Sequence, residues 1–376
     1  MTLQNILQAF EQTNQLGQSI ALATLVKAQG STYRRPGARM LMTSQGQMVG
    51  SLSGGCLEGD VYEQAQEVMA SGKPIVVQYD TMSDEDIIWG LGLGCNGIVQ
   101  ILIERVEEES PFNPLAFLAK CIKCRQLGVL ATVFYVEGQL KAQVGSRLMV
   151  YPDRTINTNI ADADLVAQIS DDSLPALDNK HSTIKAYPLA TGQAEVFIEV
   201  IQPPVPLMIF GAGHDAVPLV RLAQELGWYV TVVDSRAGDS TKERFPNAHE
   251  VILGRPETIG DRIQLDNHTM AVVMTHNYLH DLELLKILLS SSVKYLGILG
   301  PKNRTEKLLQ DLKEQGTIPT EQQLQRLYSP VGLAIGADTP EEIALSIVAE
   351  IQAVLAHRSG GSLRNQPGPI HDRGMV

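Results

Sequence analysis

VPLMIFGAGHDAVPLVRLAQELGWYVTVVDSR, residues 205–236, is the stretch that decides the fold of the second half of this chain. It opens with an apolar run that ends in glycines, as expected of a parallel strand buried on both faces. A segment with helical spacing and a closing glycine follows, and a second apolar run then ends at Asp234. This order predicts a strand, a helix and a second, parallel strand.

The glycines of this stretch have the spacing Gly211-x-Gly213-x-x-Ala216, and Asp234 follows about 20 residues later. Such spacing is typical of dinucleotide-binding units, in which the helix presents free amides to a phosphate or diphosphate. Two further apolar runs, AVVMTH and YLGILG, each lead into a helical segment. The repeated units predict an α/β fold with a Rossmann-like parallel sheet.

Charged residues at the ends of these strands are candidate contacts to a ligand. Asp234 suits ribose hydroxyl groups, as for NAD, whereas Arg236 stands two residues later and suits a phosphate. Lys302 and Arg304 follow another strand and suit an anionic ligand. Their alternative role, a solvated first helical turn, is disfavoured because cations oppose the dipole at a helix N-terminus.

Two histidines and another aspartate lie in the same set of loops, where open α/β sheets bind ligands. His214 directly follows the second glycine, and an exposed loop histidine is its alternative role. His276 and Asp281 follow a third strand, and helix capping is the alternative for that loop. The candidate cofactor-binding residues of this half are therefore Gly211, Gly213, His214, Asp234, His276, Asp281, Lys302 and Arg304.

The first half of the chain contains an internal sequence repeat. LATLVKAQGSTYRRPGARMLM, from Leu22, aligns without gaps on LATVFYVEGQLKAQVGSRLMV, from Leu130. The aligned pairs include Gly37 with Gly145, Arg39 with Arg147 and, further on, Glu104 with Glu199. The repeat predicts a duplicated αββ-type unit, with both copies in one sheet that has helices on one side, as in an α+β domain. Residues kept in both copies are best explained by the shared fold.

Features present in one copy only need another reason. The first copy alone has Arg34 and Arg35, where the second has alanine and glutamine. It alone has SGGC, with Gly54, Gly55 and Cys56, where the second has ADAD. An insertion around TMSDEDIIWGLGLGCNG adds a second thiol among glycines, Cys95. We therefore expect the function of this half to lie in these segments.

The chemistry of a thiol narrows the roles of Cys56 and Cys95. A helix N-terminus stabilises a thiolate, which can attack, carry sulfur as a persulfide or ligate a soft metal. Both are candidate catalytic and metal-binding residues, and sulfur carriage and metal ligation stay open for each. A cysteine hydrolase is disfavoured because no histidine precedes His181. Cys121 and Cys124 lie in a predicted helix, where one packed and one surface cysteine are expected.

Composition and charge exclude some classes of partner and location for this protein. A formal net charge of −12 argues against nucleic acid as a partner, and no long apolar run predicts a membrane span. The chain starts with a predicted amphipathic helix rather than a secretory signal, and four cysteines indicate a reducing, cytoplasmic setting. The prolines around Pro203 predict two domains, 1–203 and 204–357, and a flexible tail, 358–376.

Several long motifs resemble the XdhC/CoxI family, and they follow the family's order along nearly the whole chain. They are GSTYRRPGARMLM, GSLSGGCLEGDV, GLGLGCNG, IFGAGHDAVPLVRLAQELGWYVTVVDSR and PVGLAIGADTPEEIALSIVAEI. The resemblance implies an accessory protein that binds the molybdenum cofactor (molybdopterin), protects it, assists its sulfuration and delivers it to a xanthine dehydrogenase-like apo-enzyme. It also implies that Cys56 and Cys95 meet molybdenum or relay sulfur, with a cysteine desulfurase as partner. We expect a homodimer.

Two other functions remain open from the residues. A nicotinamide-dependent oxidoreductase would use NAD or NADP in the Rossmann-like half, with His276 or His280 as proton donor. It leaves the thiols and arginines of the first copy unexplained. A structural adaptor that docks onto a molybdenum enzyme without binding any cofactor is the third interpretation. A maturation chaperone explains more of the sequence than a catalyst does.

Overall fold

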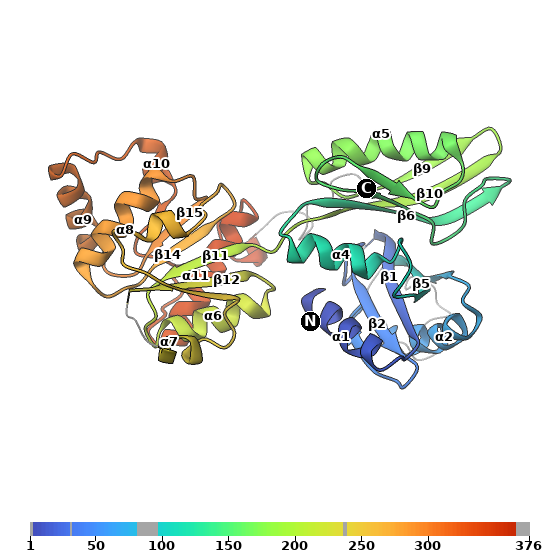
Figure 1. Cartoon of the computed structure of the whole chain (residues 1–376), viewed down its shortest axis with the longest axis horizontal. Helices are drawn as coiled ribbons and strands as arrows, with labels where there is room; N and C mark the ends of the chain where they lie inside the picture. Colours follow the sequence, from blue (N-terminus) through green and yellow to red (C-terminus); the bar gives the residue numbers. More distant parts are fainter. Residues whose placement is uncertain (1–2, 31, 81–96, 236–238, 366–376) are drawn as a thin grey trace. The chain divides into compact units, whose positions relative to one another are not determined.

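The computed structural model describes residues 3–30, 32–80, 97–235 and 239–365. The chain divides into two compact units, the first ending at Pro203 and the second beginning at Pro204 (Figure 1). None of the helices in these described ranges is long and apolar enough to cross a membrane.

The second unit is built on a six-stranded parallel sheet with the order β13-β12-β11-β14-β15-β16. Its strands are β11 (Pro206–Phe210), β12 (Tyr229–Asp234), β13 (Glu250–Leu253), β14 (Met270–Val273), β15 (Tyr295–Ile298) and β16 (Leu327–Tyr328). Strand order runs outward in both directions from β11 and β14, so these two neighbours form a topological switch point. The prediction of a Rossmann-like sheet is confirmed.

Helices cover both faces of this sheet (Figure 1). On one face α6 (Ala216–Glu225) and α11 (Pro340–Leu355) pack on alternate residues of the strands, such as Leu207 and Ile209. On the other face α8 (Tyr278–Ser290) and α9 (Lys302–Glu314) pack on the intervening residues, such as Met208 and Phe210. Burial on both faces explains why the strands read as continuous apolar runs. The shorter elements are α7 (Asp239–Arg244), η1 (Ile259–Arg262), α10 (Glu321–Gln325) and η2 (Leu363–Asn365).

The first unit contains two antiparallel five-stranded sheets with the same strand order, β3-β2-β1-β5-β4 and β8-β7-β6-β10-β9. The first is formed by β1 (Ile20–Gly30), β2 (Arg39–Thr43), β3 (Met48–Gly50), β4 (Ile75–Asp80) and β5 (Gly97–Val106). The second is formed by β6 (Gly128–Gly138), β7 (Arg147–Val150), β8 (Ile156–Thr158), β9 (Thr183–Leu189) and β10 (Gly192–Ile201). The shared topology confirms the duplication.

The expectation that both copies share a single sheet with helices on one side is wrong. Each copy pairs its first strand with its own last strand, β1 with β5 and β6 with β10, and so completes a sheet by itself. One face of each sheet packs on its own helix, α2 (Glu58–Ser71) or α5 (Ala163–Asn179). The opposite face is also apolar, and it packs with α1 (Leu3–Gln15), α4 (Pro114–Lys123) and the other copy.

Two crossed ion pairs connect the copies. Arg39 of the first copy pairs with Glu199 of the second, with Nη1 2.8 Å from Oε1. Arg147 of the second copy pairs with Glu104 of the first. All four side chains are buried or nearly so, which makes each pair sensitive to loss of one partner. Gly37 is kept because it turns beside this pair: its φ is +95°, and a Cβ there would lie 2.8 Å from Glu199 Oε1.

We predict that Glu199→Ala destabilises the first unit by about 3–5 kcal/mol, because it leaves the Arg39 guanidinium buried without its carboxylate. The double variant Arg39→Met/Glu199→Leu should regain most of this loss, since an apolar pair of similar volume replaces the ions. Urea denaturation monitored by hydrogen exchange of the β1 amides measures both. A loss below about 1 kcal/mol in the single variant would refute the structural weight given to this pair.

Candidate functional site

Cys56 lies in the loop of residues 51–57, between β3 and α2. Leu52 and Leu57 are only 2% and 4% exposed and anchor the two ends of the loop in the core. Between these anchors Gly54, Gly55 and Cys56 are exposed, and the cysteine is free. Cys56 is therefore an accessible thiol in the loop that leads into α2.

The carboxylate of Glu58 organises this loop from its inner side. Its Oε1 accepts from the amides of Leu52 and Ser53 at 3.1 and 2.9 Å, and its Oε2 accepts from the Ser53 hydroxyl at 2.5 Å. Ser53 Oγ in turn accepts from the amides of Gly55, Cys56 and Leu57 at 3.1–3.3 Å. Burial raises the pKa of Glu58, but the hydrogen bonds from Ser53 and Leu52 outweigh it and lower that pKa to about 2.

The second copy shows what this passage becomes without a thiol. There Asp162 caps a helix by accepting from the Leu165 amide at 3.1 Å. The helix α5 begins at Ala163, the residue that aligns with Gly55, whereas α2 begins only at Glu58. The first copy thus has a loop that exposes Cys56 where the second copy has a helical turn. Sequence comparison located this difference, but it did not identify Ser53 and Glu58 as the residues that hold the loop.

A second loop runs beside the thiol loop. A Cβ placed on Gly54 would lie 4.0 Å from the Tyr33 ring, and Tyr33 itself is 69% exposed. Arg34 and Arg35 follow Tyr33, the first half-buried and the second exposed. The structure therefore brings the segment of the two candidate arginines next to the loop of Cys56.

The predicted companion thiol, Cys95, lies outside the described residues, as does Arg236. β4 ends at Asp80 and β5 begins at Gly97. Both positions lie at the end of the sheet where β1 also ends, because Gly30 pairs with Gly97 and Asp80 with Ile98. No group of three or more histidine, cysteine or acidic side chains arranged for a metal occurs among the residues described. Of the other cysteines, Cys121 is buried and Cys124 exposed, as expected.

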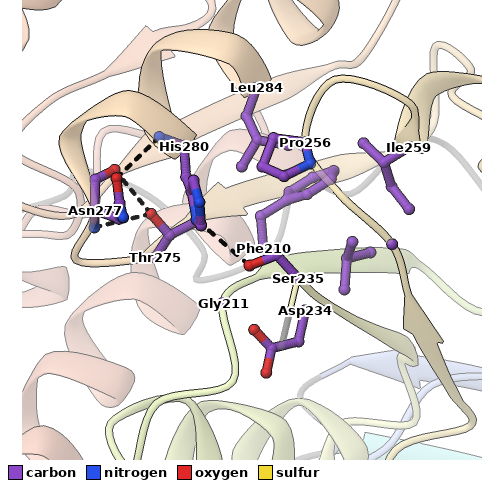
Figure 2. A pocket seen from close by; sticks show the side chains of 12 residues that line it. Phe210, Gly211, Asp234, Ser235, Pro256, Ile259, Thr275, Asn277, His280 and Leu284 are labelled. Atoms are coloured by element: carbon purple, nitrogen blue, oxygen red, sulfur yellow. Dashed lines mark hydrogen bonds between the residues drawn. The ribbon is translucent and has the colours of Figure 1, made fainter. Parts of the chain in front are cut away.

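The second unit contains a cavity of about 240 Å³ at the carboxyl ends of its central strands (Figure 2). It is lined by Phe210, Gly211, Val233, Asp234, Ser235, Gly254, Pro256, Ile259, Thr275, Asn277, His280 and Leu284. One side is apolar, from Phe210 and Leu284, and the other carries the buried carboxylate of Asp234. Ser235 Oγ lies 3.4 Å from His280 Nδ1. The cavity therefore combines an apolar wall with a carboxylate.

Gly211 is the residue that lets two loops meet beside this cavity. Its φ is +121°, and a Cβ there would overlap the carbonyl oxygen of Met274 after β14. The sequence pattern indicated Gly211 and Asp234, which the structure places in the cavity lining. The pattern did not indicate Gly254 and Pro256, because β13 is a short, half-buried strand with a weak apolar signal.

The remaining candidates occupy the loops around the cavity. His276 Nε2 lies 2.8 Å from Asp215 Oδ2, and His276 has a left-handed φ of +58°. His214 is exposed in the turn before α6, and Lys302 is exposed in the first turn of α9. Both are placed where a ligand can reach them, and their roles stay predictions.

Asp281 and Arg304 are turned toward each other. Asp281 is 2% exposed, and its Oδ2 accepts from Arg304 Nη2 at 2.6 Å. Its Oδ1 lies 2.5 Å from the Thr275 hydroxyl. Asn277 caps α8 by accepting from two amides of its first turn, so the capping interpretation is confirmed for Asn277. The pair thus holds the loop after β14 in place. A contact of Arg304 to a ligand stays a prediction.

Together these observations define a two-unit protein with an exposed thiol in a duplicated α+β unit and a cavity of about 240 Å³ in a Rossmann-like unit. Residues 14–80 match the XdhC and CoxI family, and residues 207–351 match the XdhC Rossmann domain. A Bacillus subtilis protein, named as a probable subunit of xanthine dehydrogenase, is 36% identical across 88% of this chain and 91% of that protein. The chain belongs to the XdhC and CoxI family.

Two further relatives are similar along both units. A crystal structure described as a xanthine dehydrogenase from Bacillus halodurans is 31% identical, with a TM-score of 0.75 and 98% of each chain covered. An Escherichia coli protein named molybdenum cofactor insertion chaperone PaoD is 25% identical, across 92% of this chain and 86% of that protein.

We predict that the thiol loop is ordered at neutral pH and loosens in acid. The pKa of Glu58 is lowered from 4.5 to about 2, so its stabilising hydrogen bonds are complete above about pH 4.5 and are lost as the pH falls through about 2. Glu58→Gln should therefore raise hydrogen exchange of the amides of residues 52–57 about fivefold at pH 7, since a partly exposed charged acceptor contributes about 1 kcal/mol. As the pH falls toward 2, after correction for intrinsic exchange, the difference between the variant and the wild type should shrink, because about half of the Glu58 carboxylates are then protonated. Equal protection at pH 7 would contradict the role given to Glu58.

Proposed function

We propose that this chain is an accessory protein that binds the molybdenum cofactor, protects it, assists its sulfuration and delivers it to a xanthine dehydrogenase-type apo-enzyme. The observation that carries the proposal is the Cys56 loop, in which Ser53 and Glu58 hold an exposed thiol where the second copy has a plain helical turn. Family membership and the similarity to a molybdenum cofactor insertion chaperone support it.

The chemistry of the loop suits this cargo. The molybdenum cofactor combines a soft sulfur-rich metal centre with an anionic phosphate, and a thiolate is a soft ligand. Cys56 can ligate the metal directly. It can also accept sulfur from the persulfide of a cysteine desulfurase: the donor's S–S bond breaks, a new S–S bond forms on Cys56, and the donor leaves as a thiolate. Arg34 and Arg35, in the neighbouring loop, suit the anionic part of the cofactor.

The proposal includes further parts. Cys95 acts with Cys56, and the working unit is a homodimer in the cytoplasm with the apo-enzyme and the desulfurase as partners. The second unit takes a nucleotide, either NAD(P) or the nucleotide end of a cofactor, through the cavity that Gly211 and Asp234 line. The close approach of loops at Gly211 and the buried acid at the end of β12 support this part.

A nicotinamide-dependent oxidoreductase is the second candidate, and one observation favours it. His280 lines the cavity beside Ser235, where a proton donor to a substrate carbonyl would be needed. Hydride transfer from NADH to a small carbonyl compound by the purified chain, without any molybdenum bound, would favour this candidate over the accessory role.

The test loads the purified full chain with molybdenum cofactor and measures the molybdenum retained after gel filtration. We expect Cys56→Ser and Cys95→Ser each to lower retention at least about tenfold, because loss of a metal–thiolate bond removes more than about 1.4 kcal/mol of binding. Cys124→Ser is the matched control, since Cys124 is also an exposed free cysteine, and it should retain as much as the wild type. Full retention and full activation of the apo-enzyme by both single variants would overturn the assignment of the thiols.

A further inference from the structure

The amino end of α6 carries the carboxylate of Asp215, a residue of the chain itself. In dinucleotide-binding units the second glycine of the motif leaves room for the diphosphate to approach the backbone. Here a Cβ on Gly213 would overlap Asp215 Oδ1, so the room left by Gly213 is taken by the Asp215 carboxylate. Asp215 stands at the N-cap of α6 without forming a side-chain cap, and its side chain is 19% exposed.

His276 holds this carboxylate in place. Its Nε2 lies 2.8 Å from Asp215 Oδ2, and its Cδ2 would lie 3.7 Å from a Cβ on Gly213. The two side chains come from different loops, one after β11 and one after β14, at the switch point of the sheet. The pair therefore covers the glycine turn that leads from the cavity to α6.

The Asp215 carboxylate has a different effect on a nucleoside than on a nucleoside 5′-phosphate. Asp215 is not among the residues that line the cavity, so a nucleoside held between Phe210 and Asp234 does not depend on contact with it. A phosphate on the ribose 5′ position that extends past Gly211 toward Gly213 would meet the Asp215 carboxylate. Like charges repel, and the Asp215 carboxylate already offsets the positive end of the α6 dipole. One cation does lie at the turn, since Arg244 donates to the carbonyl of Ala212 at 2.7 Å.

We propose that Asp215, positioned by His276, is a specificity residue that disfavours a fully charged 5′-phosphate, so that the cavity prefers a nucleoside whose 5′ group carries little negative charge. The preferred ligand is then a free nucleoside over a nucleoside monophosphate dianion. The inference rests on the nucleotide-binding part of the proposed function.

The test is isothermal titration calorimetry of the full chain with adenosine and with AMP. Asp215→Asn should tighten AMP binding at least about tenfold, because it removes one like charge next to the phosphate. Adenosine binding should change by less than about twofold. Asp215→Ser repeats the charge removal with a residue that caps helices well, in case the asparagine variant does not fold. Glu225→Gln is the matched control, since it removes one exposed acid from the other end of α6 and should alter neither affinity.

The outcomes separate the two claims. Wild-type binding of adenosine and AMP with no selective gain for AMP in either Asp215 variant would overturn the inference and leave nucleotide binding standing. Absence of binding of both ligands to the wild type and to the variants would overturn the nucleotide-binding part of the proposed function together with the inference.

Discussion

The crossed pairs Arg39–Glu199 and Arg147–Glu104 are the interaction on which the first unit depends. Each arginine reaches from one copy of the duplicated sheet to a glutamate of the other, and both guanidinium Nε atoms lack a partner among the described side chains. Buried ion pairs add little net stability, but they penalise any arrangement that leaves one charge alone. The two sheets are therefore held in one position relative to each other. This constraint leaves the loops of either copy free to change without loss of the fold.

The two copies differ in these loops. The second copy retains a capped helix at Asp162 and a direct connection between β9 and β10. In the first copy the helix begins later, Ser53 and Glu58 hold a loop through hydrogen bonds, and Cys56 is exposed. The Tyr33 loop with its arginines lies against the same segment. Departures from the internal repeat thus gather in one region of the first copy, which is the reason to seek its function there.

Sequence patterns predicted the fold where burial imposes a period. The apolar runs before Gly211 and Asp234 are buried on both faces, and the repeat between Leu22 and Leu130 follows the strands of two equivalent sheets. The number of sheets was not predictable, because it depends on which strand β1 and β6 pair with. Side-chain pairing was also beyond the sequence. Asp281 could equally have faced a ligand or Arg304, and only the loop geometry after β14 decides between these partners.

The displayed loop of the first copy, and not the shared fold, is the part to which we assign the function. The most direct measurement replaces residues 53–58, SGGCLE, by the aligned residues of the second copy, ADADLV, and compares retained molybdenum with the wild type. We expect an exchanged chain that keeps its two-sheet fold, because the crossed ion pairs are untouched, and that loses cofactor retention. An exchanged chain that folds and retains as much molybdenum as the wild type would contradict this assignment.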